Sequence, residues 1–212
     1  MEQNSLSQTV ASMLLKVEAI KLNPDKPFTW ASGWKSPIYC DNRVSLSDPE
    51  IRTEIKNGLA TAVKVYFPDV EVIAGVATAG IPQGALVADW LELPFCYVRP
   101  EPKKHGMGNQ IEGKIKAGQK VVLIEDLVST GGSSLKAVDA LRAAGIEVLG
   151  MVAIFTYGFE IAVQNFENAG LKFHTLSNYQ TLIEEAVKNN YISESQLITL
   201  HEWRNDPANW NV

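Results

Sequence analysis

The chain has 212 residues, a formal net charge of −5, 46% hydrophobic residues and 20% charged residues. This length suits one domain, with or without a small addition. The negative net charge argues against non-specific binding to nucleic acid, although a local basic patch is compatible with it. No apolar run approaches membrane-spanning length, the first residues lack the apolar core of a secretory signal, and Cys40 and Cys96 are too few for a disulfide framework. We therefore expect a cytoplasmic protein in a reducing compartment.

The first part of the chain is predicted to form a helix and a hairpin. Residues 5–22 carry apolar side chains at helical spacing, which predicts an amphipathic helix. Residues 28–43 read as two short strands joined by a turn at Ser32 and Gly33. A hairpin with core aromatic residues is enough to explain this stretch.

The next segment alternates helix, strand and helix. Asp48 is the expected N-cap of a helix that runs to about Tyr66. The strand 70–76 leads through Ala77, Thr78, Ala79 and Gly80 into a helix over 81–91. A strand that passes through small residues into a helix can bind an anion with backbone N–H groups. The turn matches neither a P-loop nor a dinucleotide loop, and a tight structural turn explains it equally well.

A short strand over 94–99 is followed by a long segment that cannot form a long helix. Residues 100–113 contain two prolines and three glycines, and Arg99, Lys103, Lys104 and His105 concentrate positive charge there. A charge run is usually a solvated face. Cations in such a loop, next to two anion-binding turns, can instead neutralise a leaving group while the loop excludes water.

The most informative stretch is residues 121–133. Residues 121–124 read as a buried strand, Glu125 and Asp126 follow at once, and the run of hydroxyls and glycines from Ser129 to Ser133 leads into a helix. The glycines and the helix N-terminus form an anion site. The carboxylates would repel a phosphate, so they suit vicinal hydroxyls or a nearby magnesium ion. The pattern fits a ribose 5-phosphate better than it fits a solvated helix cap.

The rest of the chain continues the alternation. Strands are expected at 147–155 and 171–176, and helices at 135–144, 159–169, 179–187 and from Ser193 to about Arg204. His174, inside a strand, reads as a structural histidine. The alternation from residue 70 to 176 predicts an α/β fold with a mostly parallel sheet, flanked by helices and with its sites at the carboxyl ends of the strands.

Three segments resemble one known family. Residues 125–133 resemble the phosphoribosyl pyrophosphate (PRPP) signature of type I phosphoribosyltransferases. Residues 28–41, with the pattern Phe-x-x-x-Ser-Gly-x-x-Ser-Pro-x-Tyr-x-Asp, resemble the base-covering hood of orotate phosphoribosyltransferases, and residues 99–106 resemble their catalytic loop. The resemblance implies a single type I phosphoribosyltransferase-like domain over 1–212. Its hood is expected mainly within about 1–45, its core within about 46–176 and its C-terminal helices within 177–212.

By this resemblance the chain transfers the phosphoribosyl group of PRPP to orotate in pyrimidine biosynthesis. Magnesium would be held mainly by PRPP, without a direct protein ligand. The enzyme would be a homodimer in which the 100–113 loop acts across the interface, with no nucleic-acid or membrane partner. A phosphoribosyltransferase for another base, such as a purine, and a PRPP-binding regulator without catalysis stay open as alternatives.

Roles carry over by position in the motifs. Lys103, His105 and Asp126 are the expected catalytic residues. The expected PRPP contacts are Thr78, Ala79, Gly80, Arg99, Lys103, His105, Glu125, Asp126, Leu127, Val128, Ser129, Thr130, Gly131, Gly132 and Ser133. The expected orotate contacts are Ser32, Gly33, Tyr39 and Ser129.

The chain departs from the family pattern at several ligand-binding positions. Ala31, Ala79 and Pro100 stand where some members have lysine. No arginine occurs in 156–159, near where some members bind the orotate carboxylate. Other groups are therefore expected to bind the ligands at these positions.

Overall fold

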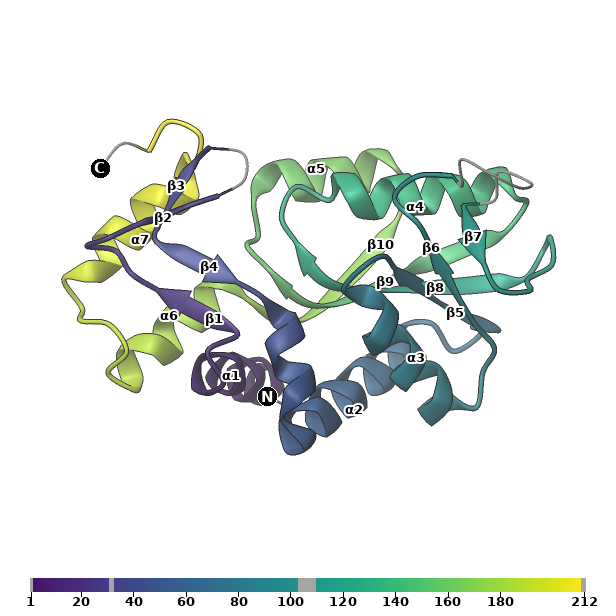
Figure 1. The fold of residues 1–212 in the computed structure, drawn as a ribbon, viewed down its shortest axis with the longest axis horizontal. Coiled ribbons are helices and arrows are strands. Elements are labelled where there is room, and N and C mark those ends of the chain that lie inside the picture. The colour runs from purple at the N-terminus through teal and green to yellow at the C-terminus, as the bar shows by residue number, and fades with distance from the viewer. Residues whose placement is uncertain (1, 31–32, 103–109, 211–212) are drawn as a thin grey trace. The chain divides into compact units, whose positions relative to one another are not determined.

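The fold, shown in Figure 1, comes from a computed structural model that describes residues 2–30, 33–102 and 110–210. The chain forms two compact units. One unit combines residues 1–52 with 177–212, and the other consists of residues 53–176. The predicted boundaries of hood, core and C-terminal helices within a single domain stay a prediction.

The first unit contains short strands and four helical segments. Its elements are α1 (Glu2–Lys16), β1 (Ile20–Leu22), β2 (Phe28–Thr29), β3 (Lys35–Ser36), β4 (Ile38–Cys40), the 3-10 helix η1 (Asn42–Ser47), α6 (Tyr179–Lys188) and α7 (Gln196–Asn205). The predicted hairpin is present, since β2 pairs antiparallel with β3. The Trp203 indole N–H donates to the Lys35 carbonyl at 3.2 Å, which ties α7 to this hairpin.

The predicted helix over 5–22 is wrong at its C-terminal end. The helix stops at Lys16, Glu18 has a positive φ of 57°, and β1 pairs antiparallel with β4. Ile20 lies opposite Cys40 in this ladder. Helical spacing alone could not reveal that strand partner, because pairing with a distant segment overrides local preference.

The second unit is built on a six-stranded sheet with the order β10-β9-β8-β5-β6-β7. Its elements are α2 (Pro49–Tyr66, which begins in the first unit), β5 (Val72–Val76), α3 (Gly80–Leu91), β6 (Phe95–Val98), β7 (Ile111–Glu112), β8 (Lys120–Val128), α4 (Gly132–Ala143), β9 (Glu147–Thr156), α5 (Glu160–Asn168) and β10 (Lys172–Asn178). The neighbours β6, β5, β8 and β9 are mutually parallel, and β7 is antiparallel to β6. The predicted mostly parallel α/β sheet is confirmed.

Helices cover both faces of this sheet. Figure 1 shows α4 and α5 on one face and α2 and α3 on the other. Every residue of β5 is buried, as expected for a strand covered on both sides. Within the part of the chain that the structure describes, no helix combines the length and the apolar character needed to cross a bilayer.

The two crossovers around the sheet centre run in opposite directions. From β5 the chain passes through α3 to β6, toward one edge, and from β8 it passes through α4 to β9, toward the other. Since β5 and β8 are neighbours, the turns after them diverge. Such a switch point is where open α/β sheets bind ligands, at the carboxyl ends of the strands.

His174 on β10 packs against the rings of Tyr66, the last residue of α2, and of Phe67, which follows the helix. Its ring lies parallel to that of Tyr66, with 3.6 Å between centroids, and Phe67 meets it edge-on at 5.8 Å. Burial, and then the nearby charge of Lys172, lower the pKa of His174. Folding therefore favours the neutral form of the His174 side chain.

Replacing His174 by Phe should reduce the loss of unfolding free energy that occurs as the pH falls below about 7. An unfolded histidine takes up a proton near pH 6.5, whereas His174 in the folded protein resists until lower pH. The unfolding free energy of the wild type should fall as pH drops below about 7 and through the lowered pKa, because the unfolded state binds the proton first. Denaturant unfolding at several pH values measures this, and equal slopes in both proteins would contradict it.

Candidate active site

The two predicted anion-binding turns lie side by side at the switch point. In the β5–β8 ladder Gly75 lies opposite Ile124, so the strands end at the same edge. A Cβ on Gly80 would meet the Ile124 carbonyl oxygen and would lie 3.3 Å from the Cα of Glu125. Only glycine allows this approach, which brings the start of α3 against the acidic end of β8.

The turn before α3 offers backbone groups rather than charge. Ala79 is the N-cap residue of α3, and its side chain makes no capping hydrogen bond. The first N–H groups of an α-helix have no partner within the helix. This turn suits an anion through backbone donors, as expected for a sequence with Ala79 in place of a lysine.

The two acids of β8 point to different surroundings. Glu125 is only 5% exposed, and Ser134 Oγ donates to its Oε2 at 3.0 Å while the Asp126 N–H donates to its Oε1 at 3.0 Å. Burial raises the pKa of Glu125 well above its usual value, and the charge of Asp126 adds to the effect. Asp126 is more accessible. Asp126 is therefore the better placed of the two to accept hydrogen bonds from a ligand.

The loop from Ser129 to Ser133 is held from the neighbouring helix α5. Asn165 Nδ2 donates to the Thr130 carbonyl at 3.0 Å. Gly131 has a φ of 81°, and a Cβ there would lie 2.7 Å from the Phe166 ring. The loop geometry thus depends on two α5 side chains.

Leu127 and Val128, both predicted PRPP contacts, are still part of strand β8. Val128 is 1% exposed, and its carbonyl accepts hydrogen bonds from Thr156 Oγ1 and the Tyr157 N–H. A substrate contact at Val128 would therefore use the backbone rather than the side chain.

Arg99 and Ser133 line one cavity. Its volume is about 240 Å³, and it lies where the ends of β5 and β6 meet the first turn of α4. Its lining residues are Val76, Ala77, Val98, Arg99, Pro100, Glu101, Ser133, Lys136 and Ala137. Arg99 also forms an ion pair with Glu112 at 3.4 Å. The structure thus brings part of the predicted PRPP set onto a common cavity.

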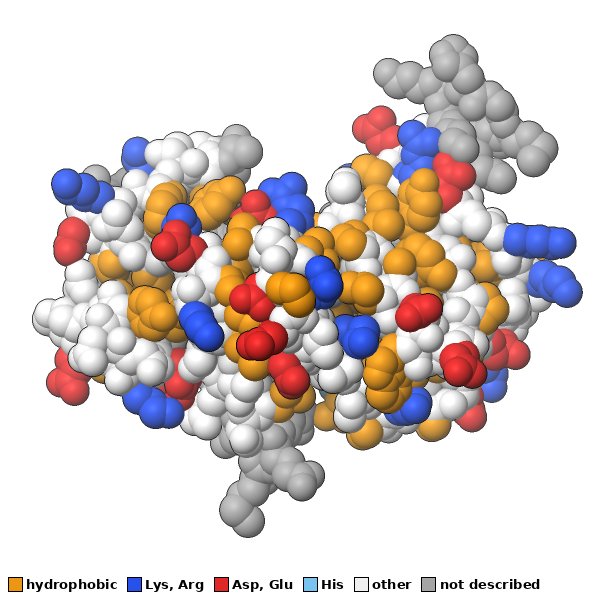
Figure 2. Space-filling view, turned by 60° about the horizontal axis from the view of Figure 1, so that its bottom comes forward, with side chains coloured by type: hydrophobic (Ala, Val, Ile, Leu, Met, Phe, Trp, Pro, Cys, Tyr) orange, Lys and Arg blue, Asp and Glu red, His pale blue; other side chains and the backbone are white. Residues whose placement is uncertain are grey.

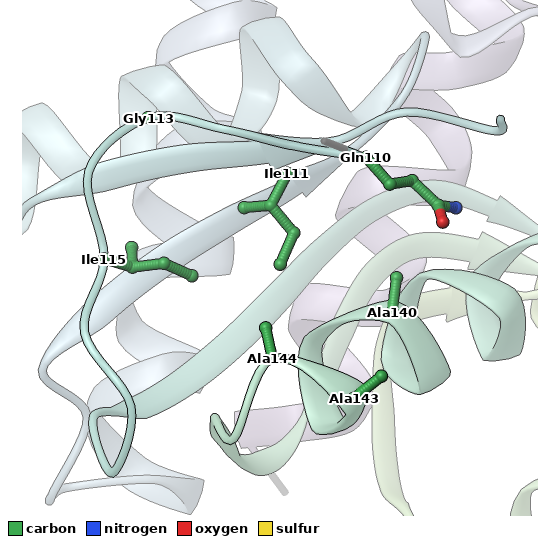
Figure 3. A pocket seen from close by; sticks show the side chains of 7 residues that line it. All are labelled: Gln110, Ile111, Gly113, Ile115, Ala140, Ala143 and Ala144. Carbon is green, nitrogen blue, oxygen red and sulfur yellow. The ribbon is translucent and has the colours of Figure 1, made fainter. Parts of the chain in front are cut away.

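A larger cavity lies at the other end of α4 and has a different character. It measures about 410 Å³, and Figure 3 shows it between β7 and the last turn of the helix. The described residues that line it are Gln110, Ile111, Gly113, Ile115, Ala140, Ala143 and Ala144. None of these described residues is charged or is one of the expected substrate contacts.

Three of the predicted site residues are not described by the structure, and two others belong to the other compact unit. Lys103, His105 and Ser32 lie outside the described residues. Gly33 and Tyr39 belong to the other compact unit. There Gly33 has a φ of 88° in the hairpin turn, and Tyr39 is 44% exposed beside Phe28, with 5.7 Å between ring centroids.

Sequence reasoning missed three side chains that support the site: Ser134, Asn165 and Thr156. Asn165 and Thr156 gave no local signal, because their partners are distant in sequence. Ser134 did give one. It shares the buried stripe of α4 with Ala137, Val138 and Leu141, where a polar residue calls for a partner.

Comparison with known proteins agrees with the geometry. The phosphoribosyl transferase domain matches residues 50–168. The orotate phosphoribosyltransferase of Cytophaga hutchinsonii is 62% identical over 204 residues, which are 96% of this chain and 98% of that relative.

Two solved structures extend the similarity to the fold. Orotate phosphoribosyltransferase from Aeropyrum pernix is 29% identical with a TM-score of 0.76, over 87% of this chain and 99% of that one. Leishmania donovani UMP synthase is 28% identical with a TM-score of 0.80, over 93% of this chain but only 42% of that longer chain. These matches confirm the predicted type I phosphoribosyltransferase fold. The chain therefore belongs to the phosphoribosyl transferase domain family and, within it, to the orotate phosphoribosyltransferases.

Proposed function

We propose that this chain transfers the 5-phosphoribosyl group from PRPP to orotate, giving orotidine 5′-phosphate and pyrophosphate in de novo pyrimidine biosynthesis. One observation carries the proposal. The acidic end of β8, which leads into the hydroxyl–glycine turn, lies against the small-residue turn after β5 at the switch point of the sheet, in a member of the orotate phosphoribosyltransferase family.

Each part of PRPP has a proposed place. Glu125 and the more accessible Asp126 accept hydrogen bonds from the ribose hydroxyls, and Asp126 is the better placed of the two. Backbone N–H groups and hydroxyls of Ser129–Ser133 bind the 5′-phosphate at the start of α4. The backbone of Thr78–Gly80 and the charge of Arg99 bind the diphosphate. This division keeps the carboxylates away from the phosphates, as electrostatic repulsion requires.

The reaction needs positioning and charge stabilisation more than it needs a protein nucleophile. Orotate N1 attacks ribose C1 while the bond from C1 to the pyrophosphate oxygen breaks, through a transition state of oxocarbenium character. Ser32, Gly33, Tyr39 and Ser129 are the proposed contacts that place orotate. Lys103 and His105 neutralise the charge that develops on pyrophosphate.

Mg²⁺ is the proposed cofactor, and the described residues fit a metal that arrives on the substrate. Among the described residues, no group of three or more His, Cys, Asp or Glu side chains could hold a metal ion. Both Glu125 oxygens already accept hydrogen bonds within the protein, so PRPP itself offers the better oxygen ligands. Mg²⁺ commonly binds through substrate phosphates and one or two carboxylates. When bound, it neutralises part of the diphosphate charge.

We further propose a cytoplasmic homodimer in which the 100–113 loop acts at the partner's site. The support for this is the family resemblance of residues 99–106 and the cysteine content. Neither Cys40 nor Cys96 forms a disulfide, which suits a reducing compartment.

Loss of orotate absorbance should require PRPP and Mg²⁺ together. The assay mixes protein, orotate, PRPP and Mg²⁺, and then leaves out each component in turn. Turnover only in the complete mixture supports the proposed reaction. No turnover, in a protein whose melting temperature still rises with PRPP, would refute it and would favour another base or a PRPP-binding regulator.

A nucleic-acid-binding regulator gains no support from the surface in view. On the face shown in Figure 2, the described Lys and Arg side chains are interspersed with Asp and Glu side chains rather than forming a continuous basic surface. The net charge of −5 points the same way.

A further inference from the structure

A buried hydrogen bond closes the predicted phosphate loop at its base. Ser134 is 1% exposed and Glu125 is 5% exposed, and the Ser134 hydroxyl donates to Glu125 Oε2 at 3.0 Å. Between these two residues lies the segment 126–133, which holds most of the predicted PRPP contacts. The bond therefore joins the two ends of the segment that is expected to surround the substrate.

The positions of both residues in their elements explain why they meet. Side chains alternate along a strand, so Glu125 lies on the same face of β8 as Val121 and Leu123. Those two residues pack in one apolar cluster with Ala137 and Val138 of α4. Ser134 is one turn earlier on that helix face. Glu125 is thus directed at α4.

The second oxygen of Glu125 is also engaged within the protein. The Asp126 N–H donates to Oε1 at 3.0 Å, so the carboxylate has one partner on β8 and one on α4. A side chain held at both oxygens keeps a single orientation. It also holds the backbone N–H of Asp126, near the end of β8 and just before the loop.

We propose that Ser134 is a positioning residue for PRPP binding, and that it acts through Glu125 by keeping the segment 126–133 in its binding conformation. The proposal rests on the proposed function only in taking PRPP as the ligand. Ser134 lies just outside the signature that ends at Ser133, and nothing in the family resemblance assigns it a role.

A preorganised loop should affect binding more than the chemical step. Without the Ser134 hydroxyl, Glu125 Oε2 loses a buried partner, and the loop must be ordered when PRPP binds. That cost is the same for bound substrate and for transition state. A loss of such uniform binding raises KM and leaves kcat nearly unchanged.

The first test is Ser134→Ala. The KM and the dissociation constant for PRPP should rise by about tenfold, the scale of one buried hydrogen bond. The kcat should stay within about twofold of wild type, and so should the KM for orotate. Ser45→Ala is the matched control. Ser45 belongs to the other unit, is fully buried, and donates its hydroxyl to the Asn42 carbonyl of the same unit. It should leave both constants for PRPP at wild-type values.

A double-mutant cycle tests whether Ser134 acts through Glu125. In a Glu125→Ala background, Ser134→Ala should add less than about twofold to the dissociation constant, because its partner is already gone. An equal factor in both backgrounds would overturn the proposal. Wild-type PRPP affinity in the single variant would overturn it as well.

An isosteric pair keeps the test valid if Ser134→Ala folds poorly. Ser134→Thr and Ser134→Val add the same volume, and only the threonine keeps the hydroxyl. The valine variant should bind PRPP about tenfold more weakly than the threonine variant, and equal affinity would refute the proposal. Calorimetric titration with PRPP alone needs no turnover. A protein that binds PRPP without converting orotate would thus refute the proposed function but still decide this inference.

Discussion

Lys103→Ala should lower kcat for orotate and PRPP by about 10²–10³-fold, the range for removal of one preorganised electrostatic group. Negative charge develops on pyrophosphate as its bond to ribose C1 breaks, so a cation there stabilises the transition state more than bound PRPP. The KM for PRPP should change much less. Steady-state kinetics with saturating PRPP and orotate separates the two constants.

The neighbouring lysine provides the control for this prediction. Lys104→Ala removes the same charge one residue away, at a position that is not among the expected catalytic residues or PRPP contacts. It should reduce kcat far less than Lys103→Ala does. An unchanged kcat in Lys103→Ala, or an equal loss in both variants, would remove the proposed role of Lys103.

Gly131→Ala should lower the free energy of unfolding by about 2–5 kcal/mol. The φ of 81° costs an L-residue about 1–2 kcal/mol. The new Cβ would also lie 2.7 Å from the Phe166 ring, and overpacking of this kind costs about 1–3 kcal/mol. PRPP binding should weaken as well, because the loop that carries its N–H donors must shift. Chemical denaturation and PRPP titration measure the two effects.

Gly118→Ala separates the two causes. Gly118 also has a φ of 81°, but a Cβ there would meet nothing within 4 Å. It should cost only the backbone term, about 1–2 kcal/mol, and should leave PRPP affinity unchanged. If both alanine variants lose the same free energy of unfolding, the contact with Phe166 does not contribute to the destabilisation.

Patterns within one segment predicted much of the fold. The buried strand before Glu125 and the helix after Ser134 gave the strand–turn–helix unit, although β8 continues to Val128 and α4 begins at Gly132. The predicted hairpin is present, and Asp48 caps α2 as expected, accepting from the N–H groups of Glu50 and Ile51. Each of these depends on residues a few positions apart.

Features that depend on distant partners were not predictable in the same way. The ladder between β1 and β4 consists of three-residue strands, which are too short to show a period. The bond from Asn165 to the Thr130 carbonyl joins residues 35 positions apart. The sequence also shows two adjacent glycines without distinguishing Gly131, which has a positive φ, from Gly132, which opens a helix. Such differences arise only from tertiary packing.

The discontinuous unit has a consequence for synthesis of the chain. Residues 1–52 leave the ribosome first, yet their unit is completed only by residues 177–212. The unit formed by residues 53–176 has its whole sequence earlier and can fold first. Until Trp203 is synthesised, the Lys35 carbonyl cannot accept the hydrogen bond that the indole N–H donates in the folded protein. A nonsense mutation just before α7 would therefore show its first defect near the opposite terminus, as protease sensitivity of the N-terminal hairpin.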